Sequence, residues 1–169
     1  MKGRNIKYLP QGGLEIVEFE VPDPGPGEVQ VQGTACGICA WDLYTYRHGS
    51  NAPSAAPPGH EGIGTVIKVG HGVTSLKEGD RVAGGGFATV HNERADSLYL
   101  MPPSRLPDEY WVVEPLSCAV TGTDHCNLRI GDRVAVVGCG FMGLLVVACL
   151  GKSFAQELIA IDIVPQRLE

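Results

Sequence analysis

The hydrophobic and polar positions in the first part of the chain alternate with a period near two, which predicts short β-strands. Over residues 14–21, apolar residues alternate with Glu15, Glu18 and Glu20, the pattern of a strand with one buried face. Turn residues separate the other expected strands, which cover residues 28–34, 62–69, 81–83, 87–90 and 97–101. Several short strands at this spacing predict a small barrel or sandwich.

The pattern changes after Asp108, which is placed to cap a helix that Pro115 interrupts early. Residues 133–137, Arg-Val-Ala-Val-Val, are a largely β-branched run, as expected of a strand buried on both faces. A helix over residues 141–152 and a second buried strand over residues 157–162 complete a β-α-β unit. Such a unit makes its two strands parallel.

Composition excludes several classes of protein. The chain has 169 residues, a net charge of −6 and an isoelectric point near 5.3, so it lacks the basic surface that nucleic-acid binding requires. Residues 1–20 hold no apolar run long enough for a signal peptide, so the six cysteines are expected to be reduced thiols of a cytoplasmic protein. Residues 134–151 carry no charge, but their glycines divide them into a strand and a helix rather than a membrane span.

A glycine-rich turn follows the first buried strand of the β-α-β unit. Gly138, Gly140 and Gly143 match the G-x-G-x-x-G fingerprint, which here follows a strand, opens a helix and precedes an acidic residue, Asp162. The glycines allow a tight turn, close approach to a pyrophosphate, and packing of helix on strand. The carboxylate of Asp162 would bond the adenosine ribose and repel a 2′-phosphate, which favours NAD over NADP. The residues expected to contact the cofactor are Gly138, Gly140, Phe141, Met142, Gly143 and Asp162.

Cys36 and Cys39 form a C-x-x-C motif that allows three interpretations. Half of a structural zinc knuckle needs a second such motif, which the sequence does not contain. A redox pair would lack its usual setting in this β-rich context. The third interpretation is a catalytic zinc held by Cys39 with His60 and Glu61, because such a zinc takes three protein ligands and keeps one open position.

A further ligand for this zinc could come from Glu114 or Cys118, which are both chemically suitable. A nucleophilic cysteine with a partner histidine, and an ordinary buried cysteine, stay open as alternatives for Cys39. The remaining histidines are expected at the surface: His48, His71, His91 and His125.

Taken together, five segments resemble the N-terminal half of the zinc-dependent medium-chain alcohol and polyol dehydrogenases. They are the ligand segments 35–43 and 58–64, the turn 73–82, the third-ligand segment 114–119 and the cofactor turn 134–143. The resemblance implies a β-rich GroES-like domain over residues 1–116. A truncated α/β Rossmann domain over residues 117–169, with only its first β-α-β unit, would follow, and the active site would lie between the two.

In this family the ligand cysteine lies three residues before an aspartate, which assigns the ligand to Cys39 and gives Asp42 a supporting role in catalysis. The implied zinc ligands are Cys39, His60 and Cys118, with Glu61 as an exchangeable ligand that also takes part in catalysis. Glu114 would lie nearby. In polyol-type members Glu61 itself completes the site, and this sequence keeps both options.

Two departures from the family pattern change what is expected of this chain. Residues 84–89 run on directly where the family often inserts a lobe with four cysteines, so we expect no structural zinc. Trp41 stands where the family has a Ser or Thr whose hydroxyl takes the proton of the alcohol. The proton must then leave by another route, through Glu61, Tyr44 or His48.

The implied function is hydride transfer between a small alcohol or polyol and NAD, with one catalytic zinc, in a homo-oligomer that binds neither membranes nor nucleic acid. The zinc would act as a Lewis acid, and the nicotinamide would take the hydride. The alternatives are a non-catalytic fragment and a zinc-free quinone or enone reductase of the same superfamily. Because a full dinucleotide domain has about six parallel strands, we expect the chain to be part of a longer protein and inactive alone.

Overall fold

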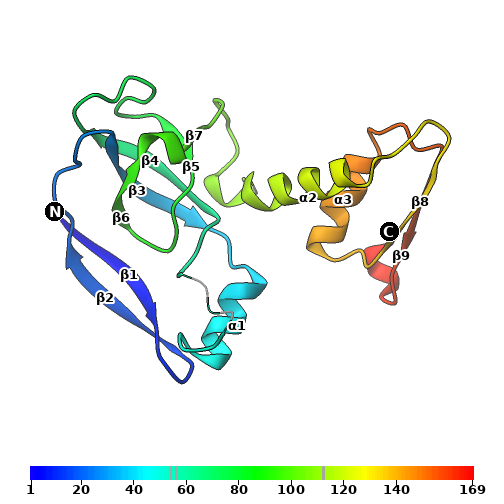
Figure 1. The fold of residues 1–169 in the computed structure, drawn as a ribbon, viewed down its shortest axis with the longest axis horizontal. Coiled ribbons are helices and arrows are strands. Elements are labelled where there is room, and N and C mark those ends of the chain that lie inside the picture. The colour runs from blue at the N-terminus through cyan, green and yellow to red at the C-terminus, as the bar shows by residue number, and fades with distance from the viewer. Residues whose placement is uncertain (54, 56, 112) are drawn as a thin grey trace. The chain divides into compact units, whose positions relative to one another are not determined.

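The computed structural model describes residues 1–53, 55, 57–111 and 113–169. These residues form two compact units, Met1–Val112 and Val113–Glu169 (Figure 1). The domain boundary predicted from the sequence, after residue 116, lies within the first helix of the second unit.

A five-stranded antiparallel sheet forms the centre of the first unit, with the strand order β6-β3-β4-β5-β7. The strands are β3 (Glu28–Cys36), β4 (Gly62–Val69), β5 (Arg81–Ala83), β6 (Val90–Arg94) and β7 (Tyr99–Leu100). Val29, Val31, Val66 and Val82 are fully buried and pack with Leu98 in one core cluster. Burial of each such side chain contributes about 1.5–3 kcal/mol, so this cluster is the main source of stability in the unit.

Strands β1 (Lys2–Tyr8) and β2 (Leu14–Glu20) form a separate antiparallel hairpin, drawn in blue in Figure 1. The prediction of β2 is confirmed, whereas the pattern does not predict β1, whose residues are mostly polar. Opposite charges face each other across the hairpin: Lys7 Nζ lies 3.3 Å from Glu15 Oε1, and Arg4 is paired with Glu18. Such cross-strand pairs stabilise a sheet, but a pattern read along one strand does not detect them.

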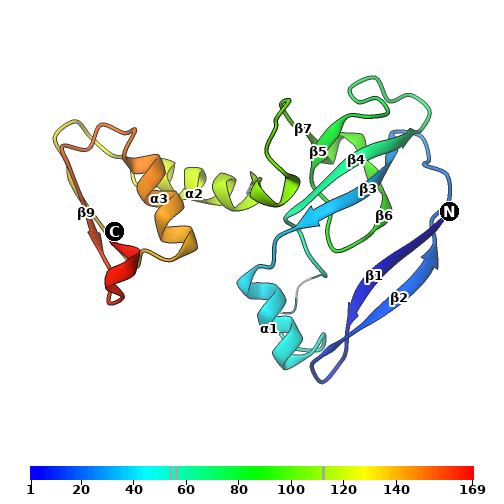
Figure 2. The same ribbon diagram turned by 180° about the vertical axis from the view of Figure 1, so that it is seen from behind.

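Helix α1 (Ala40–His48) follows β3 after a short loop, as Figure 2 shows. The hydrophobic pattern does not predict it, because its buried side chains are the polar residues Asp42 and Thr45. The helix begins with a capping interaction in which the backbone amide of Cys39 donates to Asp42 Oδ2 at 2.8 Å. A local hydrogen bond, rather than an apolar face, therefore sets the start of α1.

The strand predicted over residues 87–90 is wrong in its position. Strand β6 begins at Val90, which is the first residue of the segment to pair with β3. The backbone amide of Thr89 donates instead to the carbonyl of Arg4 on β1 at 2.9 Å. Thr89 therefore bridges two sheets, because its carbonyl accepts a hydrogen bond from the amide of Gly33 on β3 at 3.0 Å.

Asp108 does not cap a helix, contrary to the prediction. It begins a short 3-10 turn, η2 (Asp108–Tyr110), and its carboxylate accepts hydrogen bonds from the hydroxyl of Thr34 and the guanidinium of Arg81. These tertiary contacts lower the pKa of Asp108, with the Thr34 bond as the largest cause. Because the carboxylate of Asp108 is hydrogen-bonded to residues of β3 and β5, it is not available to cap a helix.

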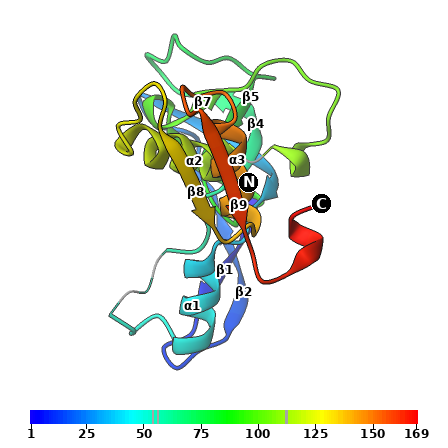
Figure 3. The same ribbon diagram turned by 90° about the vertical axis from the view of Figure 1, so that its right-hand side faces the viewer.

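The second unit contains one β-α-β connection and one additional helix. Its elements are α2 (Val113–His125), β8 (Arg133–Val137), α3 (Phe141–Leu150) and β9 (Glu157–Ile161), followed by the short turn η3 (Pro165–Arg167). The two strands are parallel as predicted, and α3 packs against the pair (Figure 3). Pro115 does not interrupt a helix: it lies in the first turn of α2, where a backbone nitrogen has no intrahelical acceptor.

The uncharged run 134–151 divides between β8, the glycine turn and α3. Gly138 ends the strand with a φ of +96°, a conformation that favours glycine. Within the described part of the chain, no helix has the length and apolar character needed to cross a membrane.

His91 is not a surface residue, contrary to the prediction. It lies on β6 opposite Val31, and both ring nitrogens are buried without a hydrogen-bond partner among the residues that the structure describes. Burial lowers the pKa of His91 below its ordinary value of 6.5, and the charge of Glu93 opposes this shift only in part. The other histidines expected at the surface are exposed: His48, His71 and His125.

We predict that His91 makes the fold sensitive to mild acid. Because its pKa is lower in the folded state, the unfolded chain binds the proton first as the pH falls below 6.5, and the free energy of unfolding decreases. His91→Phe removes this contribution. Chemical denaturation at about pH 7 and about pH 5 should show a smaller loss of stability for His91→Phe than for the parent. His71→Phe is the exposed control, and equal losses in all three proteins would contradict the prediction.

Candidate metal centre and cofactor turn

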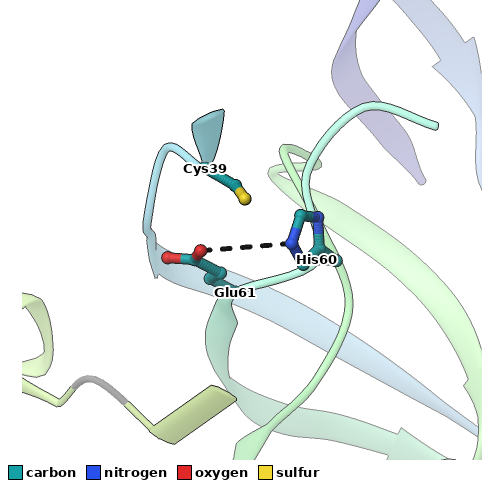
Figure 4. A group of neighbouring side chains, drawn as sticks. All are labelled: Cys39, His60 and Glu61. Atoms are coloured by element: carbon teal, nitrogen blue, oxygen red, sulfur yellow. Dashed lines mark ion pairs between the residues drawn. The ribbon is translucent and has the colours of Figure 1, made fainter. Parts of the chain in front are cut away.

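Three side chains that the sequence singles out as metal ligands converge in the first unit. The ligand atoms of Cys39, His60 and Glu61 all lie within 4.8 Å of one another, and all three residues are half-buried. Figure 4 shows the thiol, the imidazole and the carboxylate around a common centre, with His60 Nε2 4.0 Å from Glu61 Oε1. The three groups are therefore close enough to bind one metal ion.

The pairing of β3 with β4 brings these residues together. Cys36 at the end of β3 is paired with Gly62 at the start of β4, and the amide of Gly37 donates to the carbonyl of Glu61 at 3.1 Å. Adjacent ends of antiparallel strands are neighbours in space. The cysteine just beyond β3 therefore meets the histidine just before β4.

Gly37, between the two cysteines, is in contact with the carboxylate of the centre. A Cβ added at Gly37 would collide with Oε2 of Glu61. The carboxylate thus lies directly on the backbone of the C-x-x-C loop, and a larger residue at this position would displace it.

Asp42 anchors both ligand-bearing segments. Its side chain is only 2% exposed, and it accepts hydrogen bonds from the amide of Cys39 at 2.8 Å and the amide of Gly59 at 3.1 Å. The hydroxyl of Tyr8 on β1 donates to the same carboxylate at 3.0 Å. Burial, together with this bond, raises the pKa of Tyr8 to about 12. One carboxylate therefore fixes the backbone at both candidate ligands.

Cys36 lies outside the cluster, although it belongs to the same motif as Cys39. Its thiol donates to the carbonyl of Gly37 at 3.4 Å, and burial raises its pKa to about 11. The two cysteines therefore differ in environment, and only Cys39 faces the metal centre.

Helix α1 carries further groups close in sequence to Cys39. Trp41 is 61% exposed, so its indole is available to a ligand instead of packing in the core. The rings of Tyr44 and His48 have centroids 4.6 Å apart. Two side chains that can carry protons are thus in contact, one helical turn apart.

Glu114 and Cys118 belong to the second unit, whereas the three clustered side chains belong to the first. Both lie on α2, one turn apart, and the thiol of Cys118 donates to Glu114 Oε1 at 3.2 Å. Both residues are thus potential metal ligands on the same side of the helix.

The cofactor turn has the close packing that its glycines predict. A Cβ added at Gly143 would collide with the carbonyl oxygen of Gly138, whereas one added at Gly140 would meet no described atom within 4 Å. Gly140 begins α3, and no side chain caps the helix there. Phe141 and Met142, which follow it, are largely exposed. The first turn of α3 therefore presents backbone amides next to an open space.

Asp162 stabilises this turn through backbone hydrogen bonds. Its side chain is 3% exposed and accepts from the amide of Cys139 at 2.6 Å and the amide of Val164 at 2.8 Å. These two bonds are the largest causes of its lowered pKa. Arg167 Nη1 lies 3.4 Å from Oδ2. The sequence pattern does not single out this arginine, because it follows Asp162 by five residues and no regular element connects the two.

Comparisons with known proteins identify relatives of this chain. Residues 25–100 match the family model "Alcohol dehydrogenase GroES-like domain". The chain is 29% identical to (R,R)-butanediol dehydrogenase of Bacillus subtilis, over 93% of this chain and 57% of that protein. It is also 29% identical to sorbitol dehydrogenase of Gallus gallus, over 99% of this chain and 58% of that protein. Residues 25–100 thus belong to the GroES-like domain family of the alcohol dehydrogenases, and the chain as a whole is similar to these medium-chain relatives.

A solved structure of a similar protein has the same fold. An alcohol dehydrogenase of Escherichia coli CFT073, solved in complex with NADH, matches with a TM-score of 0.85 at 28% identity. That match covers 99% of this chain and 58% of the other. The β-rich first unit of this chain is thus a GroES-like domain, as the sequence resemblance implies. The chain spans a little over half the length of the relatives it matches.

The residues present in this chain suit a zinc ion and a dinucleotide. Thiol, imidazole and carboxylate are the ligand types that zinc takes in proteins, and here they lie within 4.8 Å of one another. The open space at Gly140 and the uncapped start of α3 suit a pyrophosphate, which binds at helix N-termini.

We predict that Asp42→Asn loosens the metal centre even without metal. An amide has one accepting oxygen, so its NH₂ group would face either the Cys39 amide or the Tyr8 and Gly59 donors. The free energy of unfolding should fall by about 1–3 kcal/mol, as measured by chemical denaturation. Asp23→Asn is the control, because Asp23 forms an exposed ion pair with Lys68. A variant at Asp42 as stable as this control would contradict the anchoring role.

Proposed function

We propose that this chain provides the zinc site and the cofactor turn of an NAD-dependent alcohol or polyol dehydrogenase. The observation that carries the proposal is the convergence of Cys39, His60 and Glu61 within 4.8 Å. A zinc-free quinone or enone reductase has no use for this set of ligands, so the cluster disfavours that alternative.

We assign Cys39 and His60 as fixed ligands of a single catalytic zinc, with no structural zinc. Glu61 is the exchangeable ligand, because a catalytic zinc keeps one position for substrate. Cys118 of α2 is the remaining ligand. Glu114, whose carboxylate accepts a hydrogen bond from the thiol of Cys118 at 3.2 Å, would lie beside this ligand and would lose that bond when the thiol gives up its proton to bind zinc.

When bound, zinc supplies a Lewis acid for the alcohol oxygen, and NAD supplies the acceptor for the hydride. The residues of the chain orient these groups and move the proton. Trp41 has no hydroxyl to take the proton of the alcohol, so we propose that Glu61 takes it at Oε1. The contact between the rings of Tyr44 and His48, with centroids 4.6 Å apart, supports these two side chains as the route to solvent.

In the cofactor turn, the amides at the start of α3 would bind the pyrophosphate, and Asp162 is proposed to face the adenosine ribose. Its Oδ1 accepts one hydrogen bond, from the amide of Val164, and a carboxylate oxygen can accept a second. A carboxylate at this place favours NAD over NADP. The second unit is thereby proposed to be the start of a Rossmann domain.

The substrate class is proposed from the relatives, which are named as dehydrogenases of butanediol and sorbitol. We propose a small alcohol or polyol, used by a homo-oligomer. Because the chain spans 57% and 58% of those two relatives, this activity is proposed for the whole protein. Residues 1–169 alone are expected not to turn over alcohol.

We predict about one zinc ion per chain after the metal-free protein is loaded with zinc and the excess is removed. Cys39→Ser and His60→Ala should each weaken zinc binding at least about tenfold, because each removes a direct ligand. Elemental analysis and competition with a chelator measure both effects. Cys36→Ser is the matched control, because Cys36 lies outside the cluster and should not affect the zinc content.

Three results would contradict this assignment. Zinc near zero in the parent would exclude the metal site, and two ions per chain would show a structural zinc as well. An equal loss of zinc in Cys36→Ser and Cys39→Ser would contradict the choice of ligand cysteine.

We predict that Gly140→Ala weakens NADH binding at least about tenfold without unfolding the protein. The added Cβ meets no described atom within 4 Å, so the fold tolerates it, but it occupies the space through which the backbone approaches a pyrophosphate. Fluorescence titration with NADH tests this in any protein that contains residues 1–169.

Two other glycines provide the comparison for this titration. Gly143→Ala should lower the free energy of unfolding, because its Cβ collides with the carbonyl of Gly138. Gly122→Ala, on α2, meets no described atom within 4 Å, so it should leave NADH binding unchanged and raise stability by up to about 1 kcal/mol. Equal NADH affinity of the parent and Gly140→Ala would refute the assignment of the cofactor turn.

A further inference from the structure

The loop of residues 84–86, called the glycine loop below, is hydrogen-bonded to the segment that carries two of the candidate ligands. The amide of Gly84 donates to the carbonyl of Gly62 at 2.9 Å, and the amide of Gly62 donates to the carbonyl of Gly85 at 3.2 Å. Gly62 directly follows Glu61. The ligand segment therefore cannot separate from the glycine loop at this point without breaking both bonds.

The two backbones also approach so closely that side chains are excluded. A Cβ added at Gly86 would lie 2.5 Å from the carbonyl oxygen of Pro58 and 2.7 Å from that of Gly59. A Cβ added at Gly62 would lie 2.6 Å from the carbonyl oxygen of Gly84. The two candidate ligands between Gly59 and Gly62 are thus held from both ends by contacts that only glycine allows.

The ring of His91 supports the glycine loop from the sheet. A Cβ added at Gly85 would collide with Nε2 of His91 and lie 2.7 Å from its Cε1. His91 lies on β6, opposite Val31, so its backbone is fixed in the central sheet. No hydrogen bond to a described residue orients the ring nitrogens. The imidazole therefore acts by filling the space next to Gly85.

We propose that His91 is a positioning residue for the metal centre and acts on it through the glycine loop. The ring packs against Gly85, and the carbonyl of Gly85 accepts a hydrogen bond from the amide of Gly62. Gly62 is bonded directly to Glu61, so its position limits that of the ligand. The consequence for metal binding rests on the proposed zinc site. The support itself is a property of the metal-free chain, so the two can be tested separately.

Hydrogen exchange of backbone amides in the metal-free protein tests the support. His91→Ala leaves a space below the glycine loop, so the amides of Gly62 and Gly84 should exchange at least about tenfold faster than in the parent. The amide of Gly70, which donates to the carbonyl of Glu28 at 2.9 Å elsewhere in the sheet, reports any general loss of stability. His91→Phe keeps a ring of similar size and should restore slow exchange at Gly62 and Gly84.

Binding of Co²⁺ tests the consequence for the metal centre, because its visible absorption reports the arrangement of its ligands. His91→Ala should weaken Co²⁺ binding at least about tenfold and change the absorption spectrum, and His91→Phe should restore both. His71→Ala is the control for loss of an exposed histidine. Gly86→Ala should act like His91→Ala, whereas Gly25→Ala, whose Cβ would meet only the side chain of Glu28, should act like the parent.

The results separate the two proposals. Unchanged exchange at Gly62 and Gly84 in His91→Ala would overturn the support by His91. Faster exchange with unchanged Co²⁺ affinity and spectrum would overturn its role in positioning the metal centre. If the parent bound no Co²⁺, the zinc site would be refuted while the exchange data still decided the support. Failure of His91→Phe to restore either property would overturn the space-filling role of the ring.

Discussion

The buried carboxylate of Asp42 is the interaction on which the candidate metal centre depends. It accepts hydrogen bonds from the hydroxyl of Tyr8 on β1, the amide of Cys39 at the start of α1 and the amide of Gly59 before β4. Burial of a charged carboxylate is unfavourable unless hydrogen-bond donors replace the water that it loses. Because the two ligand-bearing segments share this anchor, the backbone itself sets the distance between Cys39 and His60.

Close packing of glycines provides the second constraint on the same segment. Gly37 leaves room for the carboxylate of Glu61 on one side, and the glycine loop contacts the backbone around Gly62 on the other. The segment between Pro58 and Gly62 has no regular secondary structure of its own. It nevertheless has a defined position, because neighbouring backbones occupy the space on both sides.

In the second unit, a buried aspartate and close packing of glycines also fix the glycine turn. Gly143 allows α3 to pack on the carbonyl of Gly138, and the buried carboxylate of Asp162 accepts hydrogen bonds from the amides of Cys139 and Val164. In both units an aspartate binds backbone amides and glycines permit close approach. Both candidate binding sites are therefore preorganised by contacts of the backbone.

The sequence by itself determined the features that depend on local pattern. The period-two strands, the β-α-β unit and the spacing of the glycine turn all follow from residues close together in the chain. Only the tertiary structure brought Cys39 within 4.8 Å of His60 and Glu61 and buried the ring nitrogens of His91. These features depend on the pairing of β3 with β4 and β6, which joins residues far apart in sequence, and no local pattern of hydrophobic and polar positions encodes such contacts.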